Sequence, residues 1–113
     1  DLATGETRWQ VPLGDTPSVR THPALAGVTL PPALGVAGSP GPLATRGGLV
    51  FASGGGNTLY AFDARDGRVR WSHDLGTMGY ANPMTYRTRA GRQFVVIATG
   101  AGANTSLRAF ALP

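Results

Sequence analysis

The side chains that could do chemistry in this 113-residue sequence are few and stand apart from one another. Asp63 and Asp66 are close enough to suggest an acid–base pair, but Gly67 follows them directly and marks a turn. In a turn, such carboxylates cap backbone amides rather than transfer protons. His22 and His73 have no cysteine or pair of carboxylates near them in the sequence. We therefore predict no catalytic residue and no metal ligand in this chain.

Two further patterns suggest chemistry only at first sight. The glycines Gly54–Gly56 would suit a phosphate cradle, but such a cradle needs a helix to follow it, and here an apolar run follows. The glycines are therefore predicted to form a hairpin turn. Ser39 and Ser53 lack the sequence context of an activated nucleophile.

The composition favours many turns between short strands. The chain has 17 glycines and 9 prolines, about a fifth of its residues against roughly 12% in an average protein. No collagen-like period is present, and apolar runs such as those at 49–52 and 94–98 argue against disorder. An all-β fold of short antiparallel strands fits these features.

All ten basic residues are arginines, and the formal net charge is +4. The arginines are scattered along the sequence, whereas a nucleic-acid-binding protein usually gathers them with interleaved aromatic residues. We therefore predict solvated strand faces and no nucleic-acid partner.

The element that positions the rest is a β-hairpin over residues 59–71. Thr58–Asp63 alternates as a strand, Asp66 and Gly67 form the turn, and a return strand runs through Val69–Asp74 with Trp71 on it. The first nine residues repeat this residue pattern. Asp1, Gly5 and Trp9 have the same spacing as Asp63, Gly67 and Trp71. A chain that repeats itself in this way is expected to consist of structural repeats.

The repeat divides the chain into four parts. Residues 1–14 are predicted as the last strand of a preceding unit, with the strand itself over residues 7–13, and residues 15–42 as a Pro/Gly-rich connection. Residues 43–75 form a complete four-stranded unit, and residues 76–113 form three strands of a final unit. In that last part, strands are expected over 84–87, 93–99 and 106–112.

Four-stranded antiparallel meanders that repeat in this way predict blades of a β-propeller. The final unit has no fourth strand, and an unpaired apolar edge is a liability in a soluble protein. We therefore expect the chain to be the C-terminal part of a propeller, about two blades long. An N-terminal strand outside this sequence would complete the last blade.

The motif Ala61-x-Asp63-x-x-Asp66-Gly67-x-x-x-Trp71 resembles the tryptophan-docking motif of the pyrroloquinoline quinone (PQQ) propeller family. The residue before glycine in that motif is usually threonine, which Thr4 keeps and Asp66 replaces. The stretches GGLVFASGGGNTLYAFDARDGRVRW, YANPMTYRTRAGRQFVVIATG and AFALP are similar to the C-terminal end of quinoprotein glucose dehydrogenases and related alcohol dehydrogenases.

This resemblance implies an eight-bladed propeller that holds PQQ and Ca²⁺ near its axis in the complete enzyme. It further implies oxidation of a sugar (aldose) or alcohol in the periplasm, with electrons passed to a quinone or cytochrome. The motif's tryptophan would pack between neighbouring blades. The catalytic and calcium-binding residues would lie in other blades, so this segment would close the propeller, hold neither cofactor by itself and be inactive alone.

One loop is the candidate for cofactor contact. Gly35, Val36, Ala37 and Gly38, within the loop that runs to Ser39, lead into the innermost predicted strand of the complete blade. They are expected to face the axial channel, where glycine backbone can approach a flat cofactor closely. The alternative is a purely structural loop. Some relatives carry a histidine in the last glycine turn, but the turn at 100–104 has none.

Two other functions stay open at this point. A non-enzymatic propeller scaffold for protein–protein contacts would share the turn motif but not the last two stretches of the resemblance, which favours the enzyme. An independent small β domain that dimerises through its open edge is the third interpretation.

Overall fold

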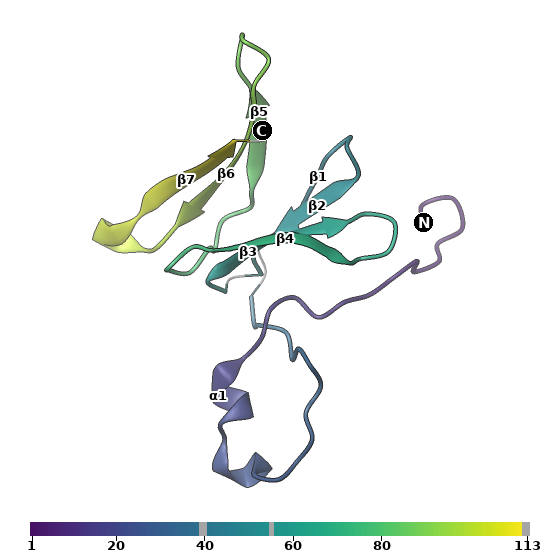
Figure 1. The fold of residues 1–113 in the computed structure, drawn as a ribbon, viewed down its shortest axis with the longest axis vertical. Helices are drawn as coiled ribbons and strands as arrows, with labels where there is room; N and C mark the ends of the chain where they lie inside the picture. Colours follow the sequence, from purple (N-terminus) through teal and green to yellow (C-terminus); the bar gives the residue numbers. More distant parts are fainter. Residues whose placement is uncertain (39–40, 55, 112–113) are drawn as a thin grey trace.

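The structure, a computed structural model, describes residues 1–38, 41–54 and 56–111. Two antiparallel sheets form the body of the molecule (Figure 1). The first sheet has four strands in sequential order, β1 (Leu43–Ala44), β2 (Leu49–Ala52), β3 (Thr58–Asp63) and β4 (Val69–Asp74). The second has three, β5 (Met84–Arg87), β6 (Gln93–Thr99) and β7 (Ser106–Ala111).

The antiparallel all-β architecture predicted from the sequence is confirmed. Each strand pairs with its neighbour in the chain, so that Leu43 faces Phe51 across the first pair and Val96 faces Ala109 in the last. The segments between strands that contain Gly47, Gly67 and Gly91 are turns, as their residues predict. The number of blades in a closed propeller stays a prediction.

The β3–β4 hairpin contains one irregularity. Ala61 pairs with Trp71 and Phe62 pairs with Val69, so the return strand holds an extra residue, Arg70. Such a bulge increases the local twist and redirects a side chain. Here the redirected side chain is that of Arg70, which reaches Asp63.

The core lies between the two sheets. Apolar side chains from both sheets, and from the residue that follows β4, form one buried cluster: Phe51, Leu59, Ala61, Leu75, Val95 and Ile97. Leu59 is fully buried and Ile97 nearly so. Alternation along β3 and β6 brings these side chains to the shared face, and their burial joins the sheets.

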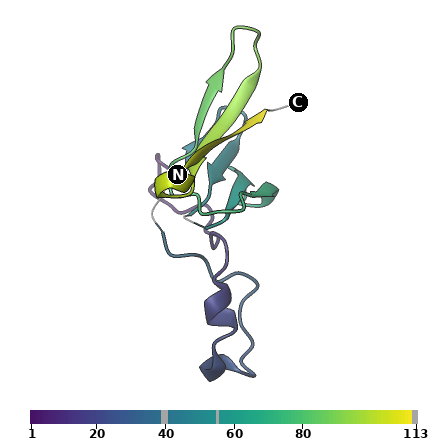
Figure 2. The same ribbon diagram turned by 90° about the vertical axis from the view of Figure 1, so that its left-hand side faces the viewer.

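The connection over residues 15–42 holds two single-turn helices that the sequence did not predict. They are α1 (Pro17–Arg20) and a 3₁₀ helix, η1 (Pro23–Leu25), each with a proline in its first turn. A third short helix, η2 (Gly102–Asn104), lies between β6 and β7. Figures 1 and 2 show the part of the connection with α1 reaching away from both sheets.

The predicted strand over residues 7–13 is wrong. The segment forms no strand in the structure. Among the described residues, its one backbone hydrogen bond joins the Val36 amide to the Leu13 carbonyl at 2.9 Å. A strand needs a paired neighbour, and Pro12 removes one donor. The assignment of residues 1–14 to a preceding blade therefore stays a prediction.

Some expectations fall outside the described residues. They are the Ser39 end of the candidate cofactor loop, the middle of the turn at 54–56 and the extension of the last strand to Leu112. None of the described residues belongs to a helix long and apolar enough to cross a bilayer.

Candidate functional site

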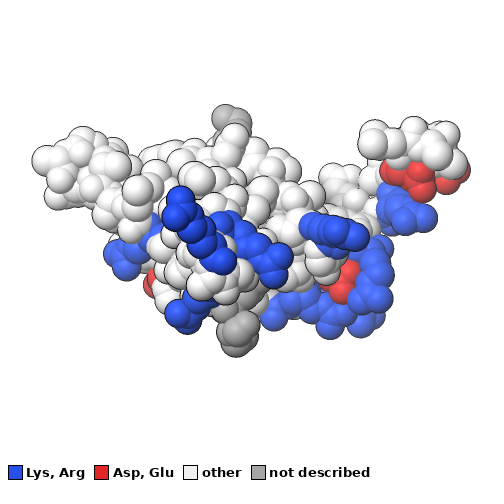
Figure 3. Space-filling view, turned by 90° about the horizontal axis from the view of Figure 1, so that it is seen from above, with Lys and Arg blue, Asp and Glu red and all other residues white. Residues whose placement is uncertain are grey.

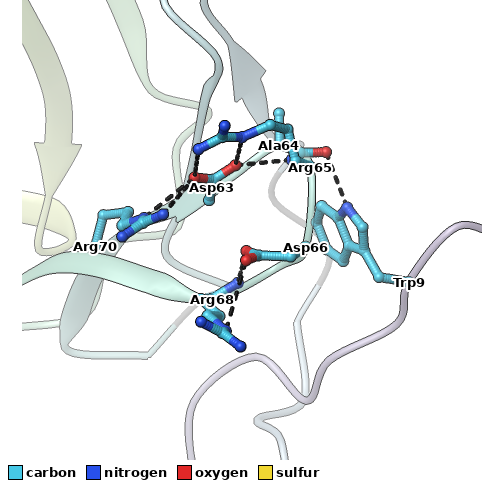
Figure 4. A network of polar contacts seen from close by, with 7 residues as sticks. All are labelled: Trp9, Asp63, Ala64, Arg65, Asp66, Arg68 and Arg70. Atoms are coloured by element: carbon cyan, nitrogen blue, oxygen red, sulfur yellow. Dashed lines mark hydrogen bonds and ion pairs between the residues drawn. The ribbon is translucent and has the colours of Figure 1, made fainter.

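Asp63 lies at the end of β3 and organises the turn that follows. Its carbonyl oxygen accepts a hydrogen bond from the Gly67 amide at 2.9 Å, and its own amide donates to the Arg68 carbonyl at 2.8 Å. The Oδ1 atom accepts from the Arg65 amide, also at 2.9 Å. Backbone and side chain of one residue therefore close both the hairpin and the tight turn within it. Figure 4 shows the contacts of the Asp63 side chain.

Two guanidinium groups hold the same carboxylate. Arg65 donates to both oxygens, at 3.0 Å from Nε and 2.9 Å from an Nη, and Arg70 donates to Oδ2 at 3.1 and 2.8 Å. These bonds, first from the side chain and then from the amide of Arg65, followed by Arg70, hold the pKa of Asp63 far below its usual range. A carboxylate so firmly ionised is an anchor rather than a general base.

The first copy of the motif repeats most of these contacts, although Ala3 stands where the second copy has Arg65. The Gly5 amide donates to the Asp1 carbonyl at 2.8 Å, and the Ala3 amide donates to Asp1 Oδ1 at 2.9 Å. Arg8, in the register of Arg70, lies 3.3 Å from Asp1 Oδ2. The repeat in the sequence is therefore a repeat of hydrogen bonds.

Trp9 joins the first copy of the motif to the second. Its indole Nε1 donates to the Ala64 carbonyl at 2.9 Å, and its ring lies against Gly67. A Cβ at Gly67 would stand 2.6 Å from the Trp9 ring, and φ at this residue is +72°. Glycine is thus required twice, by the left-handed backbone and by the close approach of the ring.

Trp71, the tryptophan of the second copy, lies between the two sheets. Its ring meets Phe110 of β7 edge-on at a centroid distance of 5.3 Å and stacks on His73 at 5.8 Å. Together with Phe110 it lines an apolar groove of about 510 Å³. Trp71 is 38% exposed, so its packing among the described residues is incomplete.

The predicted cofactor loop, residues 35–38, lies against the segment that follows Trp9. The Gly35 amide donates to the Gly14 carbonyl at 3.1 Å, and Val36 packs over Gly54, where a Cβ would meet its side chain at 3.1 Å. Ala37 and Gly38 are exposed. Val36 borders a cleft of about 370 Å³ whose walls include Tyr60.

The residues around this cleft bear on the Ca²⁺ that the resemblance implies. Ca²⁺ takes six to eight oxygen ligands, yet the described residues contain no group of three or more His, Cys, Asp or Glu that could hold a metal ion. Asp15, the carboxylate at the cleft, is already engaged by Arg20, whose hydrogen bond lowers the pKa of Asp15. The described residues therefore do not assemble a calcium site.

The arginines, scattered in the sequence, gather in space. The β2–β3 turn and the β6–β7 turn both bond the segment before β5, through Gly56 to Gly79 and through Gly100 to Met78. The other three turns therefore lie at the opposite end of the sheets. We call this the arginine end, defined by Arg46, Arg65, Arg68, Arg70, Arg87, Arg89 and Arg92. In Figure 3, viewed from above, arginine side chains form several groups on the same face.

Comparisons with known proteins identify relatives of this chain. The profile of a family described as PQQ, glucose/ethanol/alcohol dehydrogenase, β-propeller domain, matches residues 1–95. The quinate/shikimate dehydrogenase (quinone) of Acinetobacter baylyi is 36% identical over 102 residues, which cover 88% of this chain and 12% of that protein.

Two further relatives carry dehydrogenase names. The glycerol dehydrogenase large subunit of Gluconobacter oxydans is 39% identical over 93 residues, 81% of this chain and 12% of that protein. The 1-butanol dehydrogenase (cytochrome c) of Thauera butanivorans is 47% identical over 62 residues, 55% of this chain and 9% of that protein. The chain thus spans about one eighth or less of the length of these relatives.

The lowered pKa of Asp63 predicts an acid-dependent loss of stability. Its ionised form stabilises the fold above the unfolded-state pKa of about 3.9, and this contribution is lost as pH falls from there towards the lowered folded-state value. Asp63→Asn should therefore lower the thermal midpoint at neutral pH and flatten its decline in acid. The measurement is thermal unfolding followed by circular dichroism across this pH range.

Asp66→Asn is the matched control, because asparagine can still accept from the Arg68 amide at Oδ1 and the Asp66 side chain is 41% exposed. This variant should keep the acid dependence of the parent protein. An Asp63→Asn variant whose midpoint declines in acid as steeply as that of the parent would contradict the assignment.

The contact of Trp9 with Gly67 predicts a coupled pair of substitutions. Gly67→Ala should destabilise the fold by about 1–3 kcal/mol or more, through the left-handed backbone and the clash with the ring. In a Trp9→Ala background the clash is gone, so the same change should cost only the backbone strain. Urea unfolding of the four proteins measures this coupling.

Gly47→Ala is the control for that series, because no atom lies within 4 Å of the position that its Cβ would take and φ at Gly47 is not positive. It should leave the free energy of unfolding nearly unchanged. If the losses of unfolding free energy caused by the Trp9 and Gly67 substitutions were additive, the predicted contact between the ring and the turn would be contradicted.

Proposed function

The chain belongs to the PQQ-dependent glucose/ethanol/alcohol dehydrogenase β-propeller family, and on that premise we propose that it is the C-terminal part of a quinoprotein dehydrogenase. The observation that carries the proposal is the family match over residues 1–95, together with the hydrogen-bonded turn repeated at Asp1 and Asp63. The complete enzyme would oxidise a sugar (aldose) or an alcohol.

The relatives' names support this substrate class. Quinate, shikimate, glycerol and 1-butanol, named for three relatives, all carry a carbon that bears a hydroxyl group. Two names also give an acceptor, a quinone or cytochrome c. We accordingly propose a quinone or cytochrome as the electron acceptor, Ca²⁺ beside PQQ in the complete enzyme, and a periplasmic or other extracytoplasmic location.

Within that enzyme, this chain would form part of the propeller wall and would help to close the ring of blades. Residues 43–75 would form one blade and residues 76–113 three strands of the last, with residues 1–14 the end of a preceding blade. The bond from the Trp9 indole to the Ala64 carbonyl, at 2.9 Å, would be the docking contact between neighbouring blades. An N-terminal strand of the same protein would pair with β7, which in the described residues pairs only with β6.

Bound PQQ would supply the two-electron quinone chemistry. Residues 35–38 would lie on the cofactor side of the propeller, with Ala37 and Gly38 exposed towards the channel. The role of this loop would be to pack against the cofactor and exclude water. No catalytic residue is assigned to the chain, which would be inactive alone.

The alternative is a non-enzymatic propeller that serves as a scaffold for protein contacts. Such a protein would keep the Asp63 turn and the Trp9 contact, because both stabilise the fold. The relatives favour the enzyme, since the three described above are all named as dehydrogenases.

The proposed activity is tested on the complete protein that carries this chain. We expect reduction of a dye acceptor when PQQ and Ca²⁺ are supplied with an aldose, a polyol or a primary alcohol. The 113-residue chain alone should reduce no dye under the same conditions. If the complete protein binds PQQ stoichiometrically and reduces no dye with any of these substrates, the scaffold alternative replaces the enzyme.

A second test addresses the loop at 35–38. Ala37→Leu in the complete protein should weaken PQQ binding by roughly tenfold, because the added carbon atoms would intrude on the cofactor. Ala26→Leu, on the exposed part of the same connection, is the matched control and should leave binding unchanged. PQQ titration monitored by absorbance measures both. Equal PQQ affinities of the two variants would show that the loop is structural.

A further inference from the structure

The positive charge of the chain is concentrated at the arginine end. The three turns there and the strand ends beside them carry seven arginines against two aspartates, Asp63 and Asp66. The rest of the chain has three arginines and four acidic residues, which nearly cancel. The whole net charge of +4 therefore comes from one end of the two sheets.

These arginines are open to solvent. All seven are exposed, and the side chains of Arg65 and Arg68 are 82% and 79% exposed. The single carboxylate of Asp63 is shared by Arg65 and Arg70, so it neutralises only part of their charge. Among the described residues, Arg46 and Arg89 take part in no recorded ion pair. The charge at this end is thus available to an external partner.

The shape of the arginine end favours an extended anionic surface, rather than a protein, as its binding partner. Its arginines come from three separate hairpins on two sheets. Figure 3 shows arginine side chains in several separate groups across the face seen from above. The turns between them consist of small residues such as Gly47, Gly48 and Gly91. A protein partner would need an apolar interface core. The turns do not offer one, and the exposed Val69 and Tyr86 beside these arginines lie on different sheets.

We propose that the arginine end docks onto the anionic phospholipid headgroups of a bilayer. The guanidinium fork matches phosphate oxygens in bidentate geometry, and basic residues near an anionic membrane each add to its attraction. This inference rests on the charge distribution and not on the proposed dehydrogenase activity. Its test requires neither PQQ nor substrate, so either proposal can fail without the other.

The test is sedimentation of the complete protein with vesicles of phosphatidylcholine alone or of phosphatidylcholine with phosphatidylglycerol. We expect binding to the anionic vesicles that weakens as salt is raised. The double variant Arg46→Gln/Arg89→Gln breaks no recorded contact and should lower the vesicle partition coefficient by roughly 10- to 30-fold. The single variant Arg89→Gln should lower it by about fivefold.

Arg108→Gln is the matched control for Arg89→Gln, because Arg108 is an exposed arginine on β7 outside the arginine end. It should bind vesicles like the parent protein. Equal binding to the two kinds of vesicle, or equal losses in Arg89→Gln and Arg108→Gln, would overturn the proposal. Binding to soluble polyglutamate without binding to anionic vesicles would also overturn it, in favour of an acidic protein partner.

Discussion

The carboxylate of Asp63 accepts hydrogen bonds from the Arg65 amide and from the guanidinium groups of Arg65 and Arg70. These bonds hold the β3–β4 turn in one conformation and place Gly67 where the Trp9 ring can lie against it. At Asp1 the amide bond recurs from Ala3, and Arg8 forms an ion pair in the place of Arg70, while Ala3 stands where the second copy has Arg65. We call such a turn, held by the carboxylate of its first aspartate, a corner. Because Trp9 of the first copy contacts the corner of the second, the placement of the first copy beside β3 and β4 depends on this one carboxylate.

The hydrogen bonds of the corner and the apolar core stabilise the fold in different ways. Buried side chains such as Leu59 and Ile97 join the two sheets without directional preference. Hydrogen bonds at the turns are directional, and they fix the register of the two strands in each hairpin. The arginines that satisfy the corner remain largely exposed, and the excess over Asp63 and Asp66 gives this end of the sheets its charge.

Much of this fold could be predicted from the sequence, because alternation and Asp-Gly or glycine turns are local signals. Thr58–Asp63 and Gln93–Thr99 are strands where these signals place them. The strand expected over residues 7–13 failed because a strand depends on a partner that local signals do not reveal. The arginine end was missed for a related reason: its residues are far apart in the sequence, and only the order of the turns brings them together. The candidate loop at 35–38 could be named, but its contacts with Gly14 and Gly54 required the structure.

The central claim is that this chain forms successive blades of a PQQ-binding propeller and that the Asp63 corner fixes how its units pack together. An experimental structure of the complete protein with PQQ bound tests it most directly. The account predicts that the two sheets are neighbouring blades, that an N-terminal strand of the same protein pairs with β7, and that residues 35–38 face the cofactor. A structure in which β7 pairs with a second copy of the chain, or in which PQQ lies far from this loop, would contradict it.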